Sequence, residues 1–400
     1  MTICAIICEY NPFHNGHAHH IEETRRITNC DYIISIMSGN YVQRGEPAIM
    51  DKWERTRAAL KCGSDLVIEL PFIYACSSAE YFANAAVDII NKTNVVDYLS
   101  FGSDSGDLDY LKNIAAKRIN KKLDLTGEIA KAYKEGISYP KAMQLIYDEP
   151  ELKSNDILGI RYLMALEKSK SSVEPVTIKR KGSEYKDKAI TSETPSATAI
   201  RKHITDSKDY NLLSKVMPKE SMHILMEEIE KGRAPVTLKS FEKQILSTLR
   251  TLKPKGIADK PHITPGLEYR LYQNAMECSN IDEVIDATVS KVFTRTRIQR
   301  LLIHALHGVT KEMHANFMDV PYVRVLGFKK RAEPLLKKIN RSCNVPVIYR
   351  AKKDYENLTD RGKALFELEA LSTDIYVLGY PNNMHSNGGQ EFSRKIIIVE

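Results

Sequence analysis

Short apolar runs alternate with helix-forming segments over residues 2–103, and this alternation constrains the fold more than any other feature of the chain. The apolar runs begin at residues 2, 31, 64 and 95, and turn signals such as Asn-Pro, Asn-Gly and Ser-Gly-Asn punctuate them. Alternating strands and helices are typical of a parallel, doubly wound α/β sheet, whose ligands bind beyond the carboxyl ends of the strands. The sequence therefore predicts a Rossmann-like domain with its site at that edge.

The rest of the chain predicts further elements and a second region. Residues 111–170 have helical patterns, and 173–182 read as a fifth strand. Helical patterns separated by Pro and Gly fill residues 206–310, and beyond residue 320 short apolar runs at 322–328, 345–350 and 374–380 suggest a small α/β unit. Because 400 residues exceed one ordinary domain, we place a boundary near Thr205. Residues 1–205 would form the catalytic domain, and 206–400 a mostly helical region.

Charge is distributed unevenly along the chain. Residues 1–110 hold 8 Lys or Arg against 15 Asp or Glu, whereas the remainder holds 50 against 36. This excess of positive charge indicates a polyanionic partner for the later part, with nucleic acid ahead of a membrane; a lysine-rich solvated surface is the alternative. No run approaches the ~18 apolar residues of a spanning helix. Seven cysteines without a C-x-x-C pair favour a reducing cytoplasm.

The segment after the first apolar run contains the motif His-x-Gly-His, formed by His14, Gly16 and His17. Two histidines at a glycine turn before a helix can face one anion, and the glycine lets backbone N–H groups approach phosphate oxygens. Such donors suit displacement at the α-phosphorus of ATP. The alternatives are loop histidines or a metal cluster, which has no carboxylate nearby except Glu9. We predict no protein-bound metal.

A second phosphate motif follows the fifth predicted strand. Ser196, Thr198 and Arg201 place two hydroxyls and a guanidinium at the start of a helix. The hydroxyls can donate to phosphate oxygens, and the arginine guanidinium can donate two hydrogen bonds at once to the β- and γ-phosphates. A plain helix cap is the alternative.

Together the two motifs resemble the adenylyl-transferring nucleotidyltransferase superfamily. The segments CEYNPFHNGH, SIMSGNYVQRGEPAIMDKWERTRAAL, GSDLVIELPF, FGS, NDILGIRY, TRTRIQRLL and YVRVLGF narrow the resemblance to the bacterial tRNA(Met) cytidine acetate ligases, over nearly the whole chain. That resemblance implies that ATP and acetate form acetyladenylate and pyrophosphate. The acetyl group would then pass to the exocyclic amine of the wobble cytidine of elongator tRNA(Met). Mg²⁺ would be compatible with the ATP, but the sequence does not show it.

The resemblance also implies an ATP site. Gly102 would close a strand where a side chain would collide with adenine or ribose; a turn glycine is the alternative. Asn155 would offer an amide to a base edge or sugar, or else cap a helix. Arg180 would bind the triphosphate, or else be a surface arginine. The FGSDSGD segment departs from the family pattern, although Asp104 still supplies an acidic residue. The remaining ATP-binding residues are Ile7, Cys8, Glu9, Tyr10, Asn11, Pro12, Phe13, His14, Asn15, Gly16, His17, Ala18, His19 and His20.

Two further sets of basic residues are candidates for the other substrates. Arg44 or Lys52, in and after the loop that begins at Ser38, could hold acetate next to the α-phosphate. Asp51 and Arg55 could instead form an ion pair that orders the following helix. A basic cluster in the later half is a candidate for RNA phosphates, with a solvated helix face as its alternative. This cluster comprises Lys291, Arg295, Arg297 and Arg300.

Two other functions compete with the ligase. A nucleotidyltransferase that makes a dinucleotide-type cofactor would share both phosphate motifs, but it needs little beyond the nucleotide domain, whereas about half of this chain follows Arg201. A noncatalytic RNA-binding protein with a degenerate nucleotide fold would not be expected to keep both motifs intact. For the transfer step we predict direct attack on acetyladenylate. A thioester on Cys8 is the rival route, although a thiol in an apolar strand should be inert.

Overall fold

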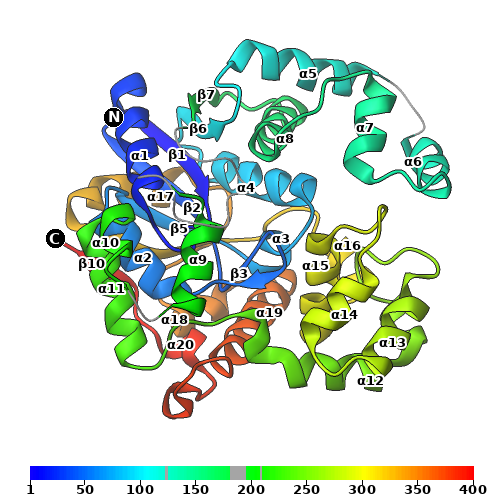
Figure 1. Ribbon diagram of the computed structural model, residues 1–400. Coiled ribbons are helices and arrows are strands. Elements are labelled where there is room, and N and C mark those ends of the chain that lie inside the picture. The colour runs from blue at the N-terminus through cyan, green and yellow to red at the C-terminus, as the bar shows by residue number, and fades with distance from the viewer. Residues whose placement is uncertain (122–124, 181–194, 208–209) are drawn as a thin grey trace.

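A computed structural model describes residues 1–121, 125–180, 195–207 and 210–400, and its centre is an eight-stranded sheet (Figure 1). The strand order is β10-β8-β5-β2-β1-β6-β7, and β9 pairs with β8. The strands are β1 (Ile3–Cys8), β2 (Tyr32–Ser38), β5 (Leu66–Leu70), β6 (Tyr98–Ser103), β7 (Glu174–Lys179), β8 (Val323–Lys329), β9 (Val347–Ile348) and β10 (Ile397–Val399).

The predicted α/β fold class is confirmed. The five strands from β1 to β7 are parallel and lie where the apolar runs predicted them. Side chains alternate between the two faces of β1. Ile3 and Ala5 pack in one large core with α4 and α8, whereas Cys4 and Ile6 face a second core formed with α1, α2 and α9. Helices on both faces explain why the strands are apolar throughout.

Nine helices and one hairpin accompany these strands in the described part of the first 207 residues. The helices are α1 (Asn15–Thr28), α2 (Lys52–Lys61), α3 (Phe72–Ala75), α4 (Ala79–Thr93), α5 (Leu108–Asn120), α6 (Leu125–Lys134), α7 (Tyr139–Tyr147), α8 (Ser154–Lys168) and α9 (Ala197–Asp206). The hairpin pairs β3 (Tyr41–Val42) with β4 (Glu46–Pro47). Figure 1 shows α5 to α8 gathered beside β6 and β7, away from the other end of the sheet.

The predicted helical region is present between residues 210 and 316. Its helices are α10 (Leu213–Val216), α11 (Lys219–Glu230), η1 (Leu238–Phe241), α12 (Glu242–Ala258), α13 (Leu267–Glu277), α14 (Ile281–Thr288), α15 (Arg295–Leu306) and α16 (Lys311–Asn316). Helices α12 to α16 form a separate group in Figure 1, below α6 and α7. A contact joins the two groups, because the Arg297 guanidinium donates to the Tyr133 hydroxyl at 3.3 Å.

The last eighty residues contain strands and helices, but the strands extend the main sheet instead of forming one of their own. β8 pairs antiparallel with β5, and β10 pairs parallel with β8. The accompanying elements are η2 (Lys330–Ala332), α17 (Glu333–Ser342), α18 (Ala351–Asp354), η3 (Tyr355–Asn357), α19 (Asp360–Val377), η4 (Asn383–His385) and α20 (Gln390–Ser393). Where the domain boundary lies, near Thr205 or elsewhere, stays a prediction.

One apolar run was assigned to the wrong kind of element. Residues 374–380 were expected to form a strand, but Asp374–Val377 are the last turn of α19. Tyr376 and Val377 are buried in the same core as Leu365 and Phe366 of that helix. A short apolar run can bury equally well in either conformation, so periodicity alone does not separate the two.

Membrane insertion receives no support from the helices. Among residues 1–121, 125–180, 195–207 and 210–400, no helix combines the length and the apolar character that crossing a bilayer requires.

Candidate active site

The two histidines of the His-x-Gly-His motif lie together at the N-terminus of α1, directly beyond β1. His14 is the N-cap residue, and its Nδ1 accepts a hydrogen bond from the Gly16 N–H at 3.0 Å. The Nδ1 atom of His17 accepts from the His14 N–H at 3.2 Å. Because a backbone N–H can only donate, both Nδ1 atoms are unprotonated. Each neutral ring therefore carries its proton on Nε2 and offers it as a donor.

Burial keeps these imidazoles neutral. Burial and the nearby guanidinium groups of Arg180 and Arg201 lower the pKa of His14 to about 3. Burial, with His14 and Arg180 adding to it, holds the pKa of His17 well below 6.5. His20, which bonds the Ser100 hydroxyl at 3.0 Å, has its pKa lowered to about 4 mainly by burial. The rings can thus act as uncharged donors throughout the neutral pH range.

Other side chains of the predicted 7–20 stretch bind neighbouring loops. The Glu9 carboxylate accepts from the Gln43 N–H at 2.8 Å, and the Asn11 side chain accepts from the Ile49 N–H at 2.8 Å. The Tyr10 hydroxyl bonds Ser35, while Asn15 donates to the carbonyl of Lys215. These contacts fix the shape of the loop around the histidines. Direct contact of the whole stretch with ATP stays a prediction.

Gly102, Asn155 and Arg180 come together at the ends of β6, α8 and β7. A Cβ added to Gly102 would lie 3.3 Å from the Arg180 Cγ, so the glycine makes room for the arginine stem. The Asn155 amide donates to Asp104 at 3.0 Å and its Oδ1 lies 3.4 Å from the Arg180 Nη1. Asp156 bonds the N–H of Asp104 and so orders the same turn. The acidic residue that follows FGS therefore holds Asn155 in place.

The second phosphate motif meets the first one across the edge of the sheet. Ser196 caps α9 by accepting from the Ala199 N–H at 3.2 Å. Arg201 donates to the Asn11 carbonyl at 2.9 Å, within the histidine loop. The Thr198 hydroxyl accepts from Arg44 at 3.2 Å and from Arg201 at 3.5 Å. Three distant parts of the sequence thus place cationic and hydroxyl groups on one side of the histidines.

Lys52 does not belong to this site, which corrects its assignment to acetate. Its ammonium group is fully buried and donates to Glu69 at 2.5 Å, Glu369 at 3.0 Å and Glu391 at 2.9 Å. An ammonium group has three donors, and here all three are taken by carboxylates. Sequence distance concealed this, because two partners lie more than 300 residues away.

Asp51 and Arg55 order α2 in a different way from the expected ion pair. Asp51 is the N-cap and accepts from the Glu54 N–H at 2.9 Å. The buried Arg55 guanidinium donates to the carbonyls of Glu9 at 2.6 Å and Ser38 at 3.1 Å, and also to the carbonyl of Gly39. It therefore ties the histidine loop to the loop after β2. This role could not be predicted from the sequence, because the acceptors are main-chain carbonyls, which every residue has.

The arginines of the predicted RNA cluster have mixed surroundings on and before α15. Arg295 is exposed and forms ion pairs with Asp282 and Asp286. Arg297 donates twice to the His262 carbonyl, at 2.8 and 3.0 Å, and Arg300 donates to the Gln43 carbonyl at 3.0 Å. Lys291 is exposed just before the helix. Arg300 is half-buried and bonded to the turn after β3, and RNA contact stays a prediction for all four residues.

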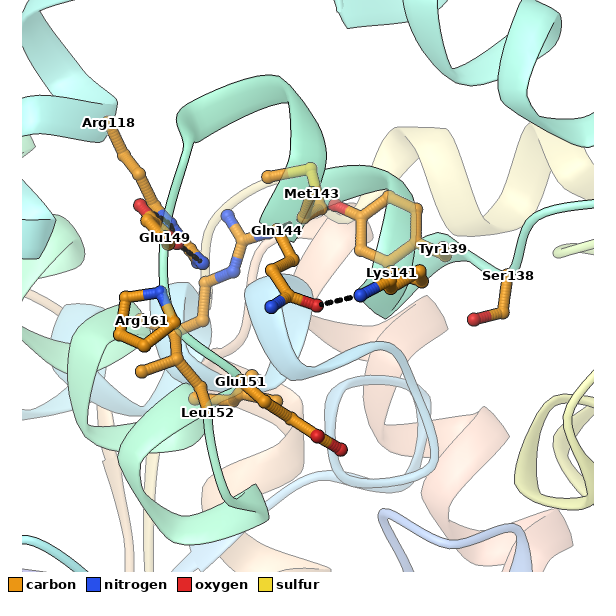
Figure 2. A pocket seen from close by; sticks show the side chains of 12 residues that line it. Arg118, Ser138, Tyr139, Lys141, Met143, Gln144, Glu149, Glu151, Leu152 and Arg161 are labelled. Carbon is orange, nitrogen blue, oxygen red and sulfur yellow. Dashed lines mark hydrogen bonds and ion pairs between the residues drawn. The ribbon is translucent and has the colours of Figure 1, made fainter.

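A pocket of about 260 Å³ lies among α5, α7 and α8, and its lining residues do not include His14 or His17. Figure 2 shows Arg118 against Glu149 in this pocket, and Arg161 beside Tyr139. Arg161 also pairs with Glu80. The buried cations of this pocket are therefore already matched by protein groups.

Comparison with known proteins identifies the family of the chain. Residues 1–391 match the model of a family described as HIGH Nucleotidyl Transferase. A tRNA(Met) cytidine acetate ligase of Acetivibrio thermocellus is 39% identical over 415 residues, with all of both chains covered. One of Thermoanaerobacter sp. is 40% identical over 407 residues, covering 99% of this chain and 100% of the relative.

The chain belongs to the tRNA(Met) cytidine acetate ligase family. Solved structures of the family have the same fold over their full length. The apo crystal structure of Thermotoga maritima TmcAL has a TM-score of 0.94, 31% identity and 100% coverage of both chains. A second crystal form of that ligase, bound with alpha-thio ATP, has a TM-score of 0.90, 30% identity and the same coverage. The family resemblance found in the sequence motifs is confirmed.

Proposed function

We propose that this chain is an ATP-dependent ligase that acetylates the wobble cytidine of elongator tRNA(Met). The observation that supports it most is the meeting of the two phosphate motifs, where Arg201 donates to the Asn11 carbonyl of the histidine loop. This arrangement lies beyond the carboxyl ends of β1 and β6, where parallel sheets bind nucleotides. The family relatives act on tRNA(Met) by name, and one is known with an ATP analogue bound.

Activation of acetate is the first step. A carboxylate oxygen attacks the α-phosphorus, the bond to the β-phosphate oxygen breaks, and pyrophosphate leaves. His14 and His17 donate from Nε2 to the oxygens on which charge develops, and Thr198 and Arg201 bind the leaving pyrophosphate. Asn155 binds a base edge or the sugar of ATP, and Arg180 binds its triphosphate. If Mg²⁺ accompanies ATP it neutralises the phosphates. No group of three metal-binding side chains occurs among the described residues.

Arg44 is the proposed partner of acetate. Its guanidinium is largely buried beside Thr198, and burial together with Arg201 lowers its pKa without removing its charge. A carboxylate bound there lies next to the phosphate motif, which raises its effective concentration at the α-phosphorus. Lys52 cannot share this role, because its ammonium group is buried among three carboxylates.

Transfer to tRNA is the second step. The exocyclic amine of cytidine is a weak nucleophile, because its lone pair is delocalised into the ring, so it needs an activated acyl group. The amine nitrogen attacks the acetyl carbonyl carbon, the bond to AMP breaks, and the amine loses one proton. The base must leave its stack and reach the acetyl group beside His14, as in other enzymes that act on a base. The reaction is expected in the cytoplasm, where tRNA and ATP meet.

A route through an acetyl-enzyme on Cys8 is not favoured. Cys8 is buried in β1, its thiol faces the Ile36 carbonyl at 3.7 Å, and burial raises its pKa. A thiol of raised pKa is rarely a thiolate at neutral pH and so is a poor nucleophile. Direct attack of the amine on acetyladenylate is therefore the proposed route.

Pure protein incubated with labelled acetate, ATP and total tRNA, followed by mass analysis of the nucleosides, tests the proposal. Acetylcytidine should form only when ATP and acetate are both present. Fractionation of the RNA should place the label in elongator tRNA(Met). Transfer of AMP to a phosphorylated small molecule, without acetylcytidine, would favour a cofactor-making nucleotidyltransferase. Binding of tRNA without turnover would favour the noncatalytic alternative.

A further inference from the structure

The start of α15 packs against the turn that carries Arg44, although the two lie about 250 residues apart in the sequence. The Gln299 Nε2 donates to the Glu46 Oε1 at 2.9 Å. The Arg300 Nη1 donates to the Gln43 carbonyl at 3.0 Å. These two bonds bracket Arg44 and Gly45, which are the tip of the β3–β4 hairpin.

The backbones of the turn and the helix are in direct contact. Gly45 has a φ of +78°, and a Cβ there would lie 2.2 Å from the Arg300 nitrogen and 2.5 Å from the Gln299 carbonyl carbon. Only glycine fits, for both conformational and steric reasons. The hairpin tip therefore has no freedom to shift along α15.

The opposite side of the same turn faces the phosphate motifs. The Gln43 N–H donates to Glu9, and Arg44 donates to Thr198 at 3.2 Å. The second carboxylate oxygen of Glu46 lies 3.4 Å from the Arg201 guanidinium. Glu46 thus links α15 on one oxygen to the phosphate-binding arginine on the other.

We propose that Gln299 and Arg300 are positioning residues of the adenylation site, holding turn 43–46 so that Arg44 lies beside Thr198. This inference rests on the proposed function for the role of Arg44 as the acetate partner. It also gives Arg300 a role other than RNA binding, because its half-buried guanidinium is bonded to the turn. Displacement of a substrate-binding group by about 1 Å can cost ~10²-fold in rate, so a loosened turn impairs catalysis without any lost substrate contact.

An exchange of hydrogen-bond partners tests this directly. Gln299→Glu places two carboxylates opposite each other. In the double variant Gln299→Glu/Glu46→Gln the amide at position 46 can donate to the carboxylate at position 299, so the hydrogen bond is restored in the opposite direction. Gln299→Met removes the bond without adding charge, and Thr296→Ala is the control on the same helix. Each protein is assayed for ATP–pyrophosphate exchange with acetate in the absence of RNA. The Kd of a nonhydrolysable ATP analogue and the unfolding midpoint are measured in parallel.

Gln299→Glu should lower exchange or weaken binding of the analogue by at least ~10-fold, which corresponds to about 1.4 kcal/mol. The double variant should return to within about 3-fold of Glu46→Gln alone, with Gln299→Met between the extremes. Equal behaviour of Gln299→Glu and Thr296→Ala, or a double variant as impaired as Gln299→Glu, would overturn the proposal. If the unmodified protein fails to exchange with acetate, the proposed function fails, while analogue binding still decides the positioning role.

Discussion

His17 accepts a hydrogen bond from the backbone N–H of His14 through Nδ1, and the two rings stack with centroids 3.8 Å apart. This bond fixes the tautomer of His17, and the Gly16 N–H fixes that of His14 in the same way, so both rings carry their proton on Nε2. Neither ring needs to change its charge for this purpose. The loop after β1 thus holds two uncharged ring N–H donors, and their contribution to the proposed activity can be measured.

Replacing His17 by Ala should reduce ATP–pyrophosphate exchange with acetate by at least ~10²-fold, because it removes a donor to the transition state and frees the His14 N–H. His223→Ala, at an exposed residue of α11, is the control. Since burial lowers the pKa of His14 to about 3, the rate should show no histidine titration near pH 6.5. Unimpaired exchange in His17→Ala would remove this histidine from the proposed role.

Removing exposed cations beside α15 should weaken RNA binding without affecting activation of acetate. We expect Lys291→Ala/Arg295→Ala to bind tRNA more weakly and to lower the slope of log K against log salt by about one unit per lost contact. Exchange without RNA should be unchanged. Lys330→Ala/Lys352→Ala, which removes the same charge elsewhere, is the control. If both pairs have the same salt slope, these residues form a solvated surface.

Cys8→Ser should still acetylate tRNA, because the proposed transfer has no acetyl-enzyme. The reaction is run with labelled acetate, ATP and tRNA, and the protein is then denatured and analysed. The unmodified protein should carry no label on Cys8. Stoichiometric label there, together with an inactive serine variant, would establish the covalent route instead.

Lys52→Met should lower the free energy of unfolding by about 3–5 kcal/mol, because it leaves the buried Glu369 without its cation. Glu69 and Glu391 would keep only Arg324 as a cationic partner. Urea denaturation measures the change. Lys61→Met, on the same helix, removes only a pair with Glu220 at 3.3 Å and should cost less than about 1 kcal/mol. Normal stability with a raised KM for acetate would restore Lys52 to the substrate site.

His304 should make the protein sensitive to acid. Its ring is fully buried, and neither ring nitrogen has a hydrogen-bond partner among the residues that the structure describes. Burial, together with the neighbouring His262, holds its pKa well below 6.5. Below pH 6.5 the unfolded chain binds a proton that the native state does not, so this histidine removes stability as the pH falls. Well above pH 6.5, where the histidine is neutral in both states, this proton-linked loss of stability disappears.

His304→Leu should therefore reduce the loss of unfolding free energy between pH 7 and pH 5 by about 2 kcal/mol, from 1.36 kcal/mol per pH unit for one group. Urea denaturation at the two pH values provides the comparison. His223→Leu controls for the loss of an imidazole from the surface. An unchanged difference between pH 7 and pH 5 in His304→Leu would mean that His304 takes up a proton in the native state.

Local patterns in the sequence were sufficient for the parallel sheet and for the phosphate motifs. The runs that form β1, β2, β5, β6 and β7 are apolar because both faces of those strands are covered. A run of apolar residues can be recognised in the sequence itself. His14 and His17 are three residues apart, so the geometry of a helix start is enough to bring them together. Ser196 likewise caps the helix that directly follows it, so its position could be predicted from the local sequence.

The tertiary structure alone decided everything that depends on distant partners. Nothing in the sequence around Lys52 distinguishes it from Arg44, yet burial among Glu69, Glu369 and Glu391 takes Lys52 away from the site. Arg300 looks like its neighbour Arg297, but its bond to the Gln43 carbonyl ties it to the β3–β4 hairpin, about 250 residues away. A side chain's role depends on which groups remove it from water. Those groups are set by the packing of segments hundreds of residues apart, which no local pattern records.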